Sequence, residues 1–359
     1  MKAAVISLGS LSSKWVIDSM KQYFKIVEDI RLKDIQLAFS KDDWEVQYKN
    51  KKLGEYDCIY AKGSFRYATL LRAISTAYEK RAYLPLKPSS FTVGHDKILT
   101  QLELQKKGIP MPKTFQISSR NTAKEMLRKM SYPIVIKIPN GTQGKGVMFA
   151  ESYSAAISLL DALTVLRQPF LVQEFVETNG TDIRAIVAGN EVIASMMRQS
   201  EPGDNRANIH AGGEGSPIVL DEYTQRIAVE SAKACKSEVC AVDILTGSKG
   251  PVVIEINLSP GLQGITKATN TNVAEKIASY LYKRTSEFVD KKKKESIKEV
   301  MDIIKPKPES KESNFIVSEL SFRGSKIMLP DIVTKICKFQ PETEYEIEAT
   351  KENLEIKKL

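Results

Sequence analysis

The first 94 residues alternate between two hydrophobic patterns. The run AAVISLG (3–9) and residues 56–63 are apolar enough for buried strands, whereas residues 14–24 and 66–78 repeat apolar positions at helical spacing. Because alternating strands and helices favour a parallel sheet, the pattern predicts a small α/β unit. Lys62 and Arg66 follow the second strand, where open α/β sheets bind ligands, so they either contact an anionic substrate or are ordinary surface cations.

A Pro- and Ser-rich stretch near residue 90 marks a boundary, and a second region of mixed patterns follows. The elements expected there are a helix over 96–107, strands over 133–139 and 147–151, and a helix over 153–166. The loop between the strands (141–146) is rich in glycine, so its backbone N–H groups can close over phosphates. Lys137 lies inside the apolar strand; either an anion such as a nucleotide phosphate pairs with it, or it extends to the sheet edge.

Several polar candidates lie on the next strand patterns, which cover 168–176, 182–189 and 191–198. Glu174 followed by Phe175 suits an adenine clamp, with a carboxylate that accepts from the base amine and an apolar contact beside it. Asp182 and Arg184 share one strand face, and Arg198 follows. Cations grouped with carboxylates suit the charge of a transferring phosphoryl group, although each pair alone is also typical of a surface ion pair.

A hairpin pattern carries three oxygen donors. Glu255 and Asn257 are two residues apart, so their side chains point to the same face of a strand, and Asp243 on the partner strand meets them across the ladder. Such a set suits Mg²⁺, which takes few protein ligands plus phosphate oxygens; a hairpin with a merely polar face is the alternative. The elements expected around these residues are a helix over 221–235, strands over 241–245 and 251–256, a loop over 261–271 and a helix over 272–284.

Length and composition are those of a soluble globular protein with two to three domains: 359 residues, 42% hydrophobic and 27% charged. No apolar run has the length of a membrane span and the N-terminus lacks a signal-peptide layout, so a cytoplasmic location is expected. The four scattered cysteines predict buried thiols. With only two histidines, carboxylates, lysines and arginines must carry any chemistry. The net charge of +9 is compatible with nucleic acid, an anionic ligand or an acidic protein as partner.

Taken in chain order, these motifs resemble the ATP-grasp ligases of the RimK type. The matching segments are HDK (95–97), IVIK (134–137), GTQGKGV (141–147), VQEF (172–175), TDIR (181–184), RANIH (206–210), AVDIL (241–245) and VIEINLSPGLQGI (253–265). The resemblance covers roughly residues 1–285. It implies a mixed α/β protein whose central part has the α+β ATP-grasp fold. The domains would be an N-terminal α/β substrate domain (1–94) and two ATP-grasp subdomains (95–175 and 176–285).

The resemblance also implies roles for individual residues. ATP would be bound by Lys97, Lys137, Gly141, Gly144, Lys145, Gly146, Glu174, Phe175, Asp182, Arg206, Ala207 and Asn208. Two Mg²⁺ ions, replaceable by Mn²⁺, would be held by Asp243, Glu255 and Asn257. The catalytic cations would be Lys137 and Arg198, the latter stabilising an acyl-phosphate and its tetrahedral successor.

The implied reaction joins L-glutamate, or a similar amino acid, to an acceptor carboxylate. The acceptor attacks the γ-phosphate of ATP, and the glutamate amine then attacks the resulting acyl-phosphate, so no protein nucleophile is needed. The acceptor is either a protein C-terminus, as in ribosomal protein modification, or a small cofactor. The rival hypothesis is a nucleotide-responsive regulator that binds DNA through the end of the chain.

The last 74 residues differ in character from the rest. Residues 286–313 have the composition of a charged linker, with four consecutive lysines and two prolines. Residues 314–359 return to strand periodicity around a short helix at 330–338 and are similar to a small β-rich domain of the AbrB type. So small a unit is expected to dimerise or dock, which predicts a homo-oligomer. DNA binding is not favoured, because this segment mixes glutamates with its lysines.

Overall fold

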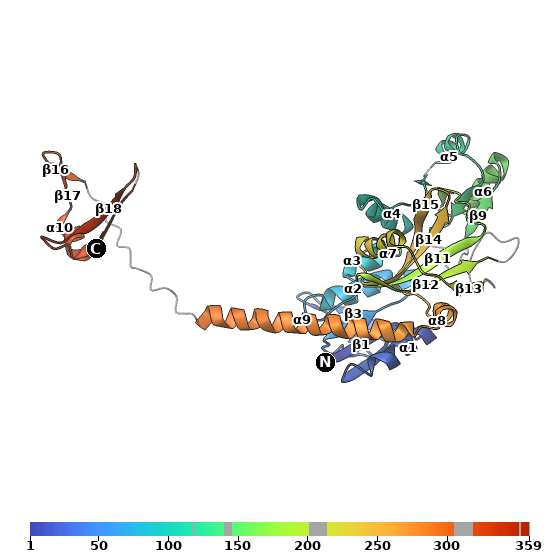
Figure 1. Ribbon diagram of the computed structural model, residues 1–359, viewed down its shortest axis with the longest axis horizontal. Helices are drawn as coiled ribbons and strands as arrows, with labels where there is room; N and C mark the ends of the chain where they lie inside the picture. Colours follow the sequence, from blue (N-terminus) through green and yellow to red (C-terminus); the bar gives the residue numbers. More distant parts are fainter. Residues whose placement is uncertain (118, 140–145, 201–213, 305–318, 352, 359) are drawn as a thin grey trace. The chain divides into compact units, whose positions relative to one another are not determined.

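The computed structural model of the protein describes residues 1–117, 119–139, 146–200, 214–304, 319–351 and 353–358. The chain divides into two compact units, Met1–Glu295 and Ser296–Leu359 (Figure 1). The first unit contains four sheets and all of the predicted site residues that the structure describes.

A parallel sheet opens the chain, as the alternation of strands and helices predicts. The strand order is β2-β1-β6, and both pairings are parallel. The first helix begins earlier than predicted because Ser10 caps it; the Ser10 Oγ accepts from the backbone N–H of Ser13 at 3.3 Å. The elements are β1 (Lys2–Ser7), α1 (Leu11–Met20), β2 (Ile26–Arg31), β6 (Cys58–Ala61), a 3₁₀ turn (Phe65–Tyr67) and α2 (Ala68–Tyr78).

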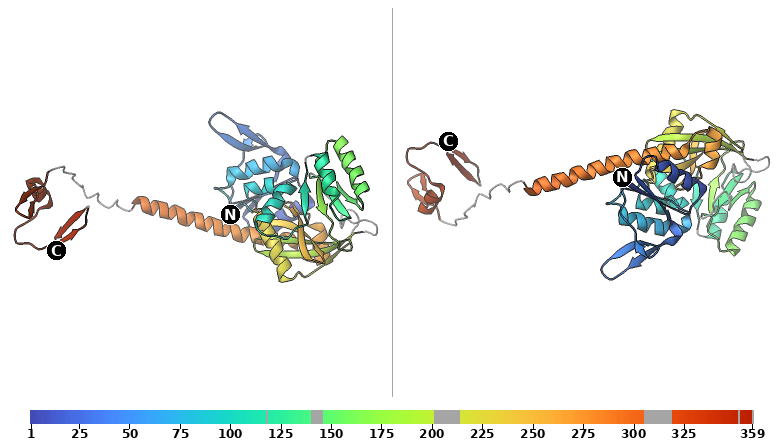
Figure 2. Two further views of the ribbon diagram at one scale, coloured as in Figure 1. Left: turned by 90° about the horizontal axis from the view of Figure 1, so that it is seen from above. Right: turned by 90° about the horizontal axis from the view of Figure 1, so that it is seen from below.

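Between β2 and β6 the chain forms a small antiparallel sheet that the sequence analysis did not predict. It comprises a 3₁₀ turn (Leu32–Asp34), β3 (Ile35–Phe39), β4 (Trp44–Tyr48) and β5 (Lys51–Lys52). The hairpin of β3 and β4 projects from the unit in Figure 2, where it is blue. Phe39 stacks on Trp44 at 5.8 Å between ring centroids. Such a short exposed hairpin has no long run of buried positions, and periodicity therefore did not reveal it.

A second, antiparallel sheet with its own small core follows. Its order is β7-β10-β8-β9, and helices α5 and α6 supply the other half of the core through Leu127 and Leu160. The elements are α3 (Pro88–Val93), α4 (Lys97–Lys106), β7 (Thr114–Gln116), α5 (Arg120–Leu127), β8 (Ile134–Lys137), β9 (Val147–Ala150), α6 (Tyr153–Val165) and β10 (Leu171–Glu174).

The third sheet holds the predicted hairpin and is antiparallel throughout, in the order β13-β12-β11-β14-β15. Its elements are β11 (Thr181–Ala188), β12 (Glu191–Gln199), β13 (Glu214–Pro217), α7 (Glu222–Ala234), β14 (Val239–Gly247), β15 (Gly250–Asn257) and α8 (Gln263–Thr269). The prediction of a loop over 261–271 is wrong, because α8 forms there and buries Ile265.

The predicted charged linker, 286–313, is helical in its first part, including residues 295–304, over which the sequence itself favours a helix before the prolines. One helix, α9 (Val273–Ile304), runs through the lysine-rich stretch. Its early turns bury Ile277 and Leu281 in the main core, whereas residues 291–297 are exposed. Lys and Glu are good helix formers, and Lys291 pairs with Glu295 at 3.7 Å one turn later, so a polar composition here continues a helix.

The second unit contains the elements that the sequence predicts for the end of the chain. They are β16 (Ser321–Arg323), β17 (Lys326–Met328), α10 (Asp331–Cys337), β18 (Tyr345–Ala349) and β19 (Leu354–Lys358). The strands form two separate hairpins, β16-β17 and β18-β19. Apolar side chains stay exposed on them, including Phe322, Ile332 and Ile347. The first part of the strand predicted near 315–322 lies outside the described residues.

Two predictions from composition can be compared with the described residues. No helix among them is both long enough and apolar enough to cross a membrane. Cys58, Cys235 and Cys240 are free buried thiols, as predicted, but Cys337 is exposed. The difference arises because Cys337 ends α10, in the unit whose described helix and strands bury none of their residues.

Candidate active site

Two lysines from different elements approach one carboxylate. Lys137 ends β8 and donates from Nζ to Gln173 Oε1 on the neighbouring strand at 2.5 Å. Lys97 begins α4 and donates from Nζ to the backbone carbonyl of Pro139 at 3.1 Å. Burial lowers the pKa of Lys137 to about 8, with nearby Glu255 opposing the shift and Lys97 adding to it. The buried lysine therefore has an uncharged hydrogen-bond partner and lies in the field of a carboxylate and a second cation.

Glu174 is the last residue of this sheet's β10, and Phe175 follows it. The backbone N–H of Glu174 donates to the carbonyl of Lys113 at 2.9 Å, which leaves its exposed carboxylate available. The Phe175 ring meets Phe149 edge to face, with 6.0 Å between centroids. The two residues thus present a carboxylate and an aromatic surface side by side, although the adenine-clamp role stays a prediction.

The third sheet gathers four charged side chains into one buried network. Arg198 on β12 donates to both oxygens of Asp182 on β11, with Nη2 to Oδ2 at 2.6 Å. Arg184 donates to both oxygens of Asp243 on β14, at 2.8 and 2.7 Å. The Nη2 of Arg198 also lies 3.1 Å from Asp243, which joins the two pairs. These side chains are only 5–15% exposed.

The strand register explains why these four meet. Asp182 is the cross-strand partner of Arg198, and Arg184 is the partner of Asp243. Burial alone would raise the pKa of Asp243, but the two guanidinium groups outweigh it and hold that pKa well below its usual range. Burial raises the pKa of Asp182 to about 6 despite the opposing effect of Arg198. The predicted roles of Arg198 at the acyl-phosphate and of Asp182 at the ribose stay predictions, with the two residues paired to each other in this structure.

Glu255 and Asn257 line a cavity of about 460 Å³ next to this network. The backbone register places Asp243 opposite Glu255, as predicted for the hairpin. The Asp243 oxygens accept from arginines, whereas Glu255 makes no hydrogen bond or ion pair with the described residues. Of the three predicted metal ligands, Glu255 and Asn257 therefore present free oxygens to the cavity, and the metal-ligand role of all three stays a prediction.

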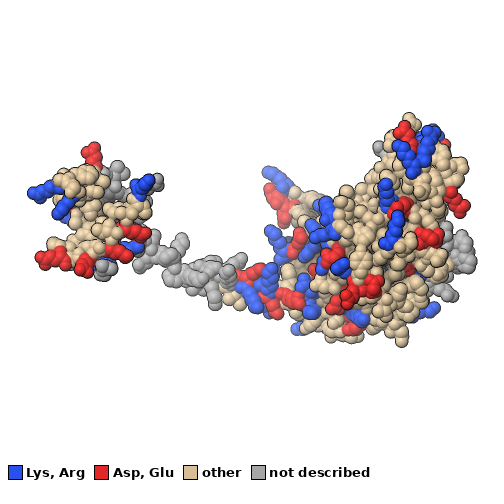
Figure 3. Space-filling model, turned by 45° about the horizontal axis from the view of Figure 1, so that its top comes forward, with Lys and Arg blue, Asp and Glu red and all other residues tan. Residues whose placement is uncertain are grey.

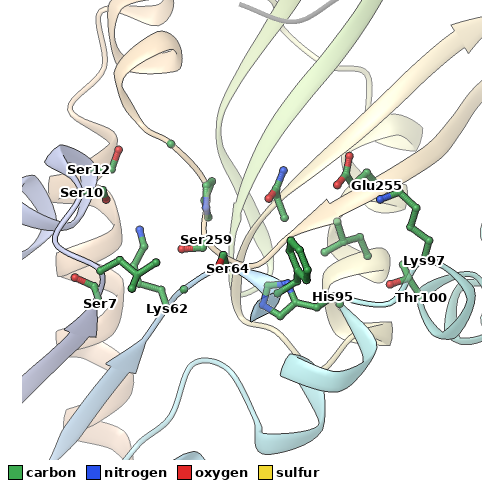
Figure 4. Close-up of a pocket in the computed structure, with 18 of the residues that line it drawn as sticks. Ser7, Ser10, Ser12, Lys62, Ser64, His95, Lys97, Thr100, Glu255 and Ser259 are labelled. Atoms are coloured by element: carbon green, nitrogen blue, oxygen red, sulfur yellow. The ribbon is translucent and has the colours of Figure 1, made fainter. Parts of the chain in front are cut away.

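The cavity extends from Glu255 and Lys97 to the carboxyl end of the parallel sheet (Figure 4). Ser7 ends β1 and Lys62 follows β6 at that far end, together with Ser10 and Ser12 at the start of α1. Arg66, the other cation considered at this strand end, is exposed and does not line the cavity. Gly94 also lines the cavity, and a Cβ there would lie 2.8 Å from the side chain of Leu258, which follows β15.

Comparison with known proteins identifies the family. The model of the RimK-like ATP-grasp domain matches residues 94–281. A probable alpha-L-glutamate ligase of Thioalkalivibrio sulfidiphilus (strain HL-EbGR7) is 38% identical over 239 residues, which are 66% of this chain and 79% of that protein. A probable alpha-L-glutamate ligase of Vibrio cholerae serotype O1 (strain ATCC 39541) is 33% identical over 291 residues, 80% of this chain and 97% of that protein. The chain belongs to the RimK-like ATP-grasp family.

The RimK-like ATP-grasp assignment makes the protein a ligase and confirms the predicted fold. Among solved structures, the ATP-grasp ligase PsnB complexed with minimal precursor, Mg and ADP is similar, with a TM-score of 0.62. Its identity is 14%, and the match covers 79% of this chain and 98% of PsnB, so the likeness shows the fold alone.

Part of the predicted RimK-like nucleotide site lies outside the described residues, namely Gly141, Gly144, Lys145, Arg206, Ala207 and Asn208. Gly146 is described and has a φ of +82°, which an L side chain rarely adopts. Its carbonyl accepts from the backbone N–H of Ile138 at 2.9 Å and so closes the base of the glycine-rich loop next to Lys137. The sequence placed Arg184 on one strand face with Asp182 but did not pair it with Asp243, and it gave no role to Gln173, although both residues lie within matching motifs.

Proposed function

We propose that this RimK-like ligase joins L-glutamate, or a similar amino acid, to an acceptor carboxylate and forms ADP and phosphate. The observation that carries the proposal is that Lys97 and Glu255 line one end of a half-open cavity and that Lys137 lies in the electrostatic field of both. Two cations and one free carboxylate in a desolvated site suit phosphoryl transfer, which is catalysed mainly by positioning and charge. The relatives named probable alpha-L-glutamate ligases support glutamate as the amino acid.

The side chains at this end of the cavity fit Mg²⁺, the ion present with ADP in PsnB. Glu255 and Asn257 share a strand face and offer oxygen donors to the cavity. Among the described residues there is no group of three or more His, Cys, Asp or Glu that could hold a metal. Mg²⁺ commonly keeps only one or two protein carboxylates and completes its shell with phosphate oxygens and water, so a small donor set is sufficient. When bound, two such ions would offset the charge of the transferring phosphoryl group.

The reaction then uses few protein groups. Lys97 and Lys137 would hold the phosphates of ATP while the acceptor carboxylate attacks the γ-phosphorus and ADP departs. The amine of L-glutamate attacks the acyl-phosphate carbon, the amide forms, and inorganic phosphate leaves with the bonding electron pair. The acyl-phosphate would hydrolyse on contact with water, so this step requires that water be excluded from the site while the intermediate exists.

The proposed function is tested by incubating the protein with ATP, Mg²⁺, L-glutamate and a cell extract of its source. ADP release should require glutamate, and mass spectrometry should find glutamate-sized additions on a protein C-terminus or on a small cofactor. Absence of glutamate-dependent ADP release with every fraction of the extract would reject the ligase proposal.

The charge of Lys137 should set the alkaline limit of activity. Its pKa is lowered to about 8, so the lysine is protonated below about pH 8 and loses its charge above it. With the other substrates saturating, kcat/KM for ATP is therefore expected to fall above about pH 8. In the Lys137→Arg variant kcat/KM should not fall above about pH 8, since a guanidinium stays protonated. If kcat/KM of the arginine variant falls with pH as in the wild type, Lys137 is not the group that sets the alkaline limit.

Nothing in the described structure or in the comparisons supports the DNA-binding alternative. Basic and acidic side chains are interspersed on the face of the first unit in Figure 3, so the net charge of +9 forms no separate basic face there. The exposed apolar residues Phe322, Ile332 and Ile347 instead support the proposal of a homo-oligomer through the second unit.

A further inference from the structure

The far end of the cavity contains a buried lysine without a counterion. Lys62 is 3% exposed and lines the cavity from the carboxyl end of β6. Its Nζ has no hydrogen bond or ion pair with any described residue, and it lies 5.6 Å from the centroid of the Tyr60 ring. Burial alone lowers its pKa to about 8, so the side chain is still mostly charged at neutral pH. A buried, unpaired ammonium is costly, and a bound anion would remove that cost.

The start of α1 adds to the same positive end. The first turn of this ten-residue helix lines the cavity with Ser10, Ser12 and Ser13. The hydroxyl groups are already used, because Ser10 bonds to Ser13 and Ser12 donates to Gln263 at 2.7 Å. The backbone N–H groups of Ser13 and Lys14 also bond to Ser10. What remains is the partial positive charge of the helix start and the backbone N–H groups of Leu11 and Ser12, which favour an anion.

The cavity itself cannot neutralise this end. Of the described residues that line it, only Glu255 is acidic, and Figure 4 shows Glu255 beside Lys97 at the opposite end from Lys62. Between the two ends lies His95, whose Nε2 is buried and has no hydrogen-bond partner. Burial lowers the His95 pKa, so the imidazole is neutral and does not supply a charge. A molecule that fills the cavity would therefore contact Glu255 and Lys97 at one end, the neutral His95 in the middle and the cationic Lys62 at the other end.

We propose that Lys62 and the start of α1 bind a second anionic group of the acceptor substrate, so that the acceptor is a dianion. The inference rests on the proposed function, because the proposed reaction places the reacting carboxyl of the acceptor near Glu255. A C-terminal acidic residue of a protein and a small dicarboxylate share this chemistry. The amino-acid donor fits less well, because its carboxylates lie few bonds from an amine that must itself reach the reacting carbon, whereas Lys62 lies at the remote end.

The test is binding, measured by calorimetry with Mg²⁺ and a non-hydrolysable ATP analogue. The probes are the dipeptide Ala-Glu, the matched amide Ala-Gln, a longer peptide ending in Ala-Glu, and L-glutamate. The wild-type protein should bind Ala-Glu about tenfold or more tightly than Ala-Gln, as expected for a charge-assisted hydrogen bond. Lys62→Met should lose this preference, and Lys62→Arg should keep it. The matched control is Lys233→Met, since Lys233 is an exposed lysine on α7 and should leave the preference unchanged.

If only the longer peptide binds, the acceptor is a protein C-terminus. If the dipeptide binds as tightly as the longer peptide, the acceptor is a small molecule. The proposal is overturned if Lys62→Met keeps the preference for Ala-Glu, if it weakens only L-glutamate, or if no dipeptide or peptide binds at millimolar concentration. Glutamate-dependent ADP release is scored separately. An active ligase whose binding ignores Lys62 rejects only the acceptor subsite, whereas Lys62-dependent binding without any ADP release rejects only the proposed reaction.

Discussion

Glu255→Gln is expected to lower ADP formation by at least about 100-fold, because even residues that only support a metal ligand typically cost 10–100-fold when changed. Within the part of the chain that the structure describes, Glu255 is the one acidic residue lining the cavity, and it lies in the field of Lys137. Without its negative charge the site keeps the cations but loses the group that would anchor Mg²⁺. The measurement is steady-state ADP release with ATP, Mg²⁺ and L-glutamate over a series of Mg²⁺ concentrations.

The same variant should fold normally. Glu255 makes no hydrogen bond or ion pair with the described residues, so its thermal unfolding midpoint should stay within a few degrees of wild type. Glu79→Gln is the matched control, because Glu79 is an exposed carboxylate that follows α2 and does not line the cavity. Near wild-type activity of Glu255→Gln at every Mg²⁺ concentration would show that the metal assignment is wrong.

Arg198→Met is expected to destabilise the first unit by about 3–5 kcal/mol, because it removes one partner from a buried ion network. Asp182 would lose its only bidentate partner, while Asp243 would keep Arg184. The side chain of Arg198 is 6% exposed, so water cannot replace the lost contacts. Equilibrium unfolding in urea, followed by far-UV circular dichroism, measures the loss.

A second variant separates the effect of the unpaired charge on stability from the effect of the changed side-chain size. Asp182→Asn combined with Arg198→Met removes both charges of one pair and should recover part of the lost stability. Glu230→Gln with Lys233→Met removes an exposed pair on α7 and should change the free energy of unfolding by less than about 1 kcal/mol. If Arg198→Met costs no more than this control pair, the network is not a stabilising element of the sheet.

Local periodicity determined much of the candidate site. Glu255 and Asn257 share a face because strand side chains alternate, and that follows from the sequence once β15 is recognised. Lys137 could be singled out because a charged residue inside the apolar run IVIK is unusual at any buried strand position. The order of motifs along the chain was sufficient to predict the family, which the comparisons confirm.

Composition gave the wrong secondary structure for two segments, because helix propensity or burial favours a helix where the composition is typical of a linker or loop. The lysine-rich stretch after residue 286 has the charge of a linker, yet Lys and Glu also favour helix, and the chain continues α9 through it. The segment 261–271 has turn residues at its start, but burial of Ile265 stabilises the short helix α8. Both outcomes depended on contacts with the rest of the fold.

The sequence by itself determined most of the strands around the site, which residues carry charge, and which family the chain belongs to, because these depend on neighbours along the chain. Only the tertiary structure decided which charges meet. Cross-strand register paired Asp182 with Arg198 and Arg184 with Asp243, and the sequence alone cannot fix such a register between β11, β12 and β14. The approach of β6 to the cavity likewise made Lys62 a buried, unpaired cation, where the sequence left it equally compatible with an exposed surface.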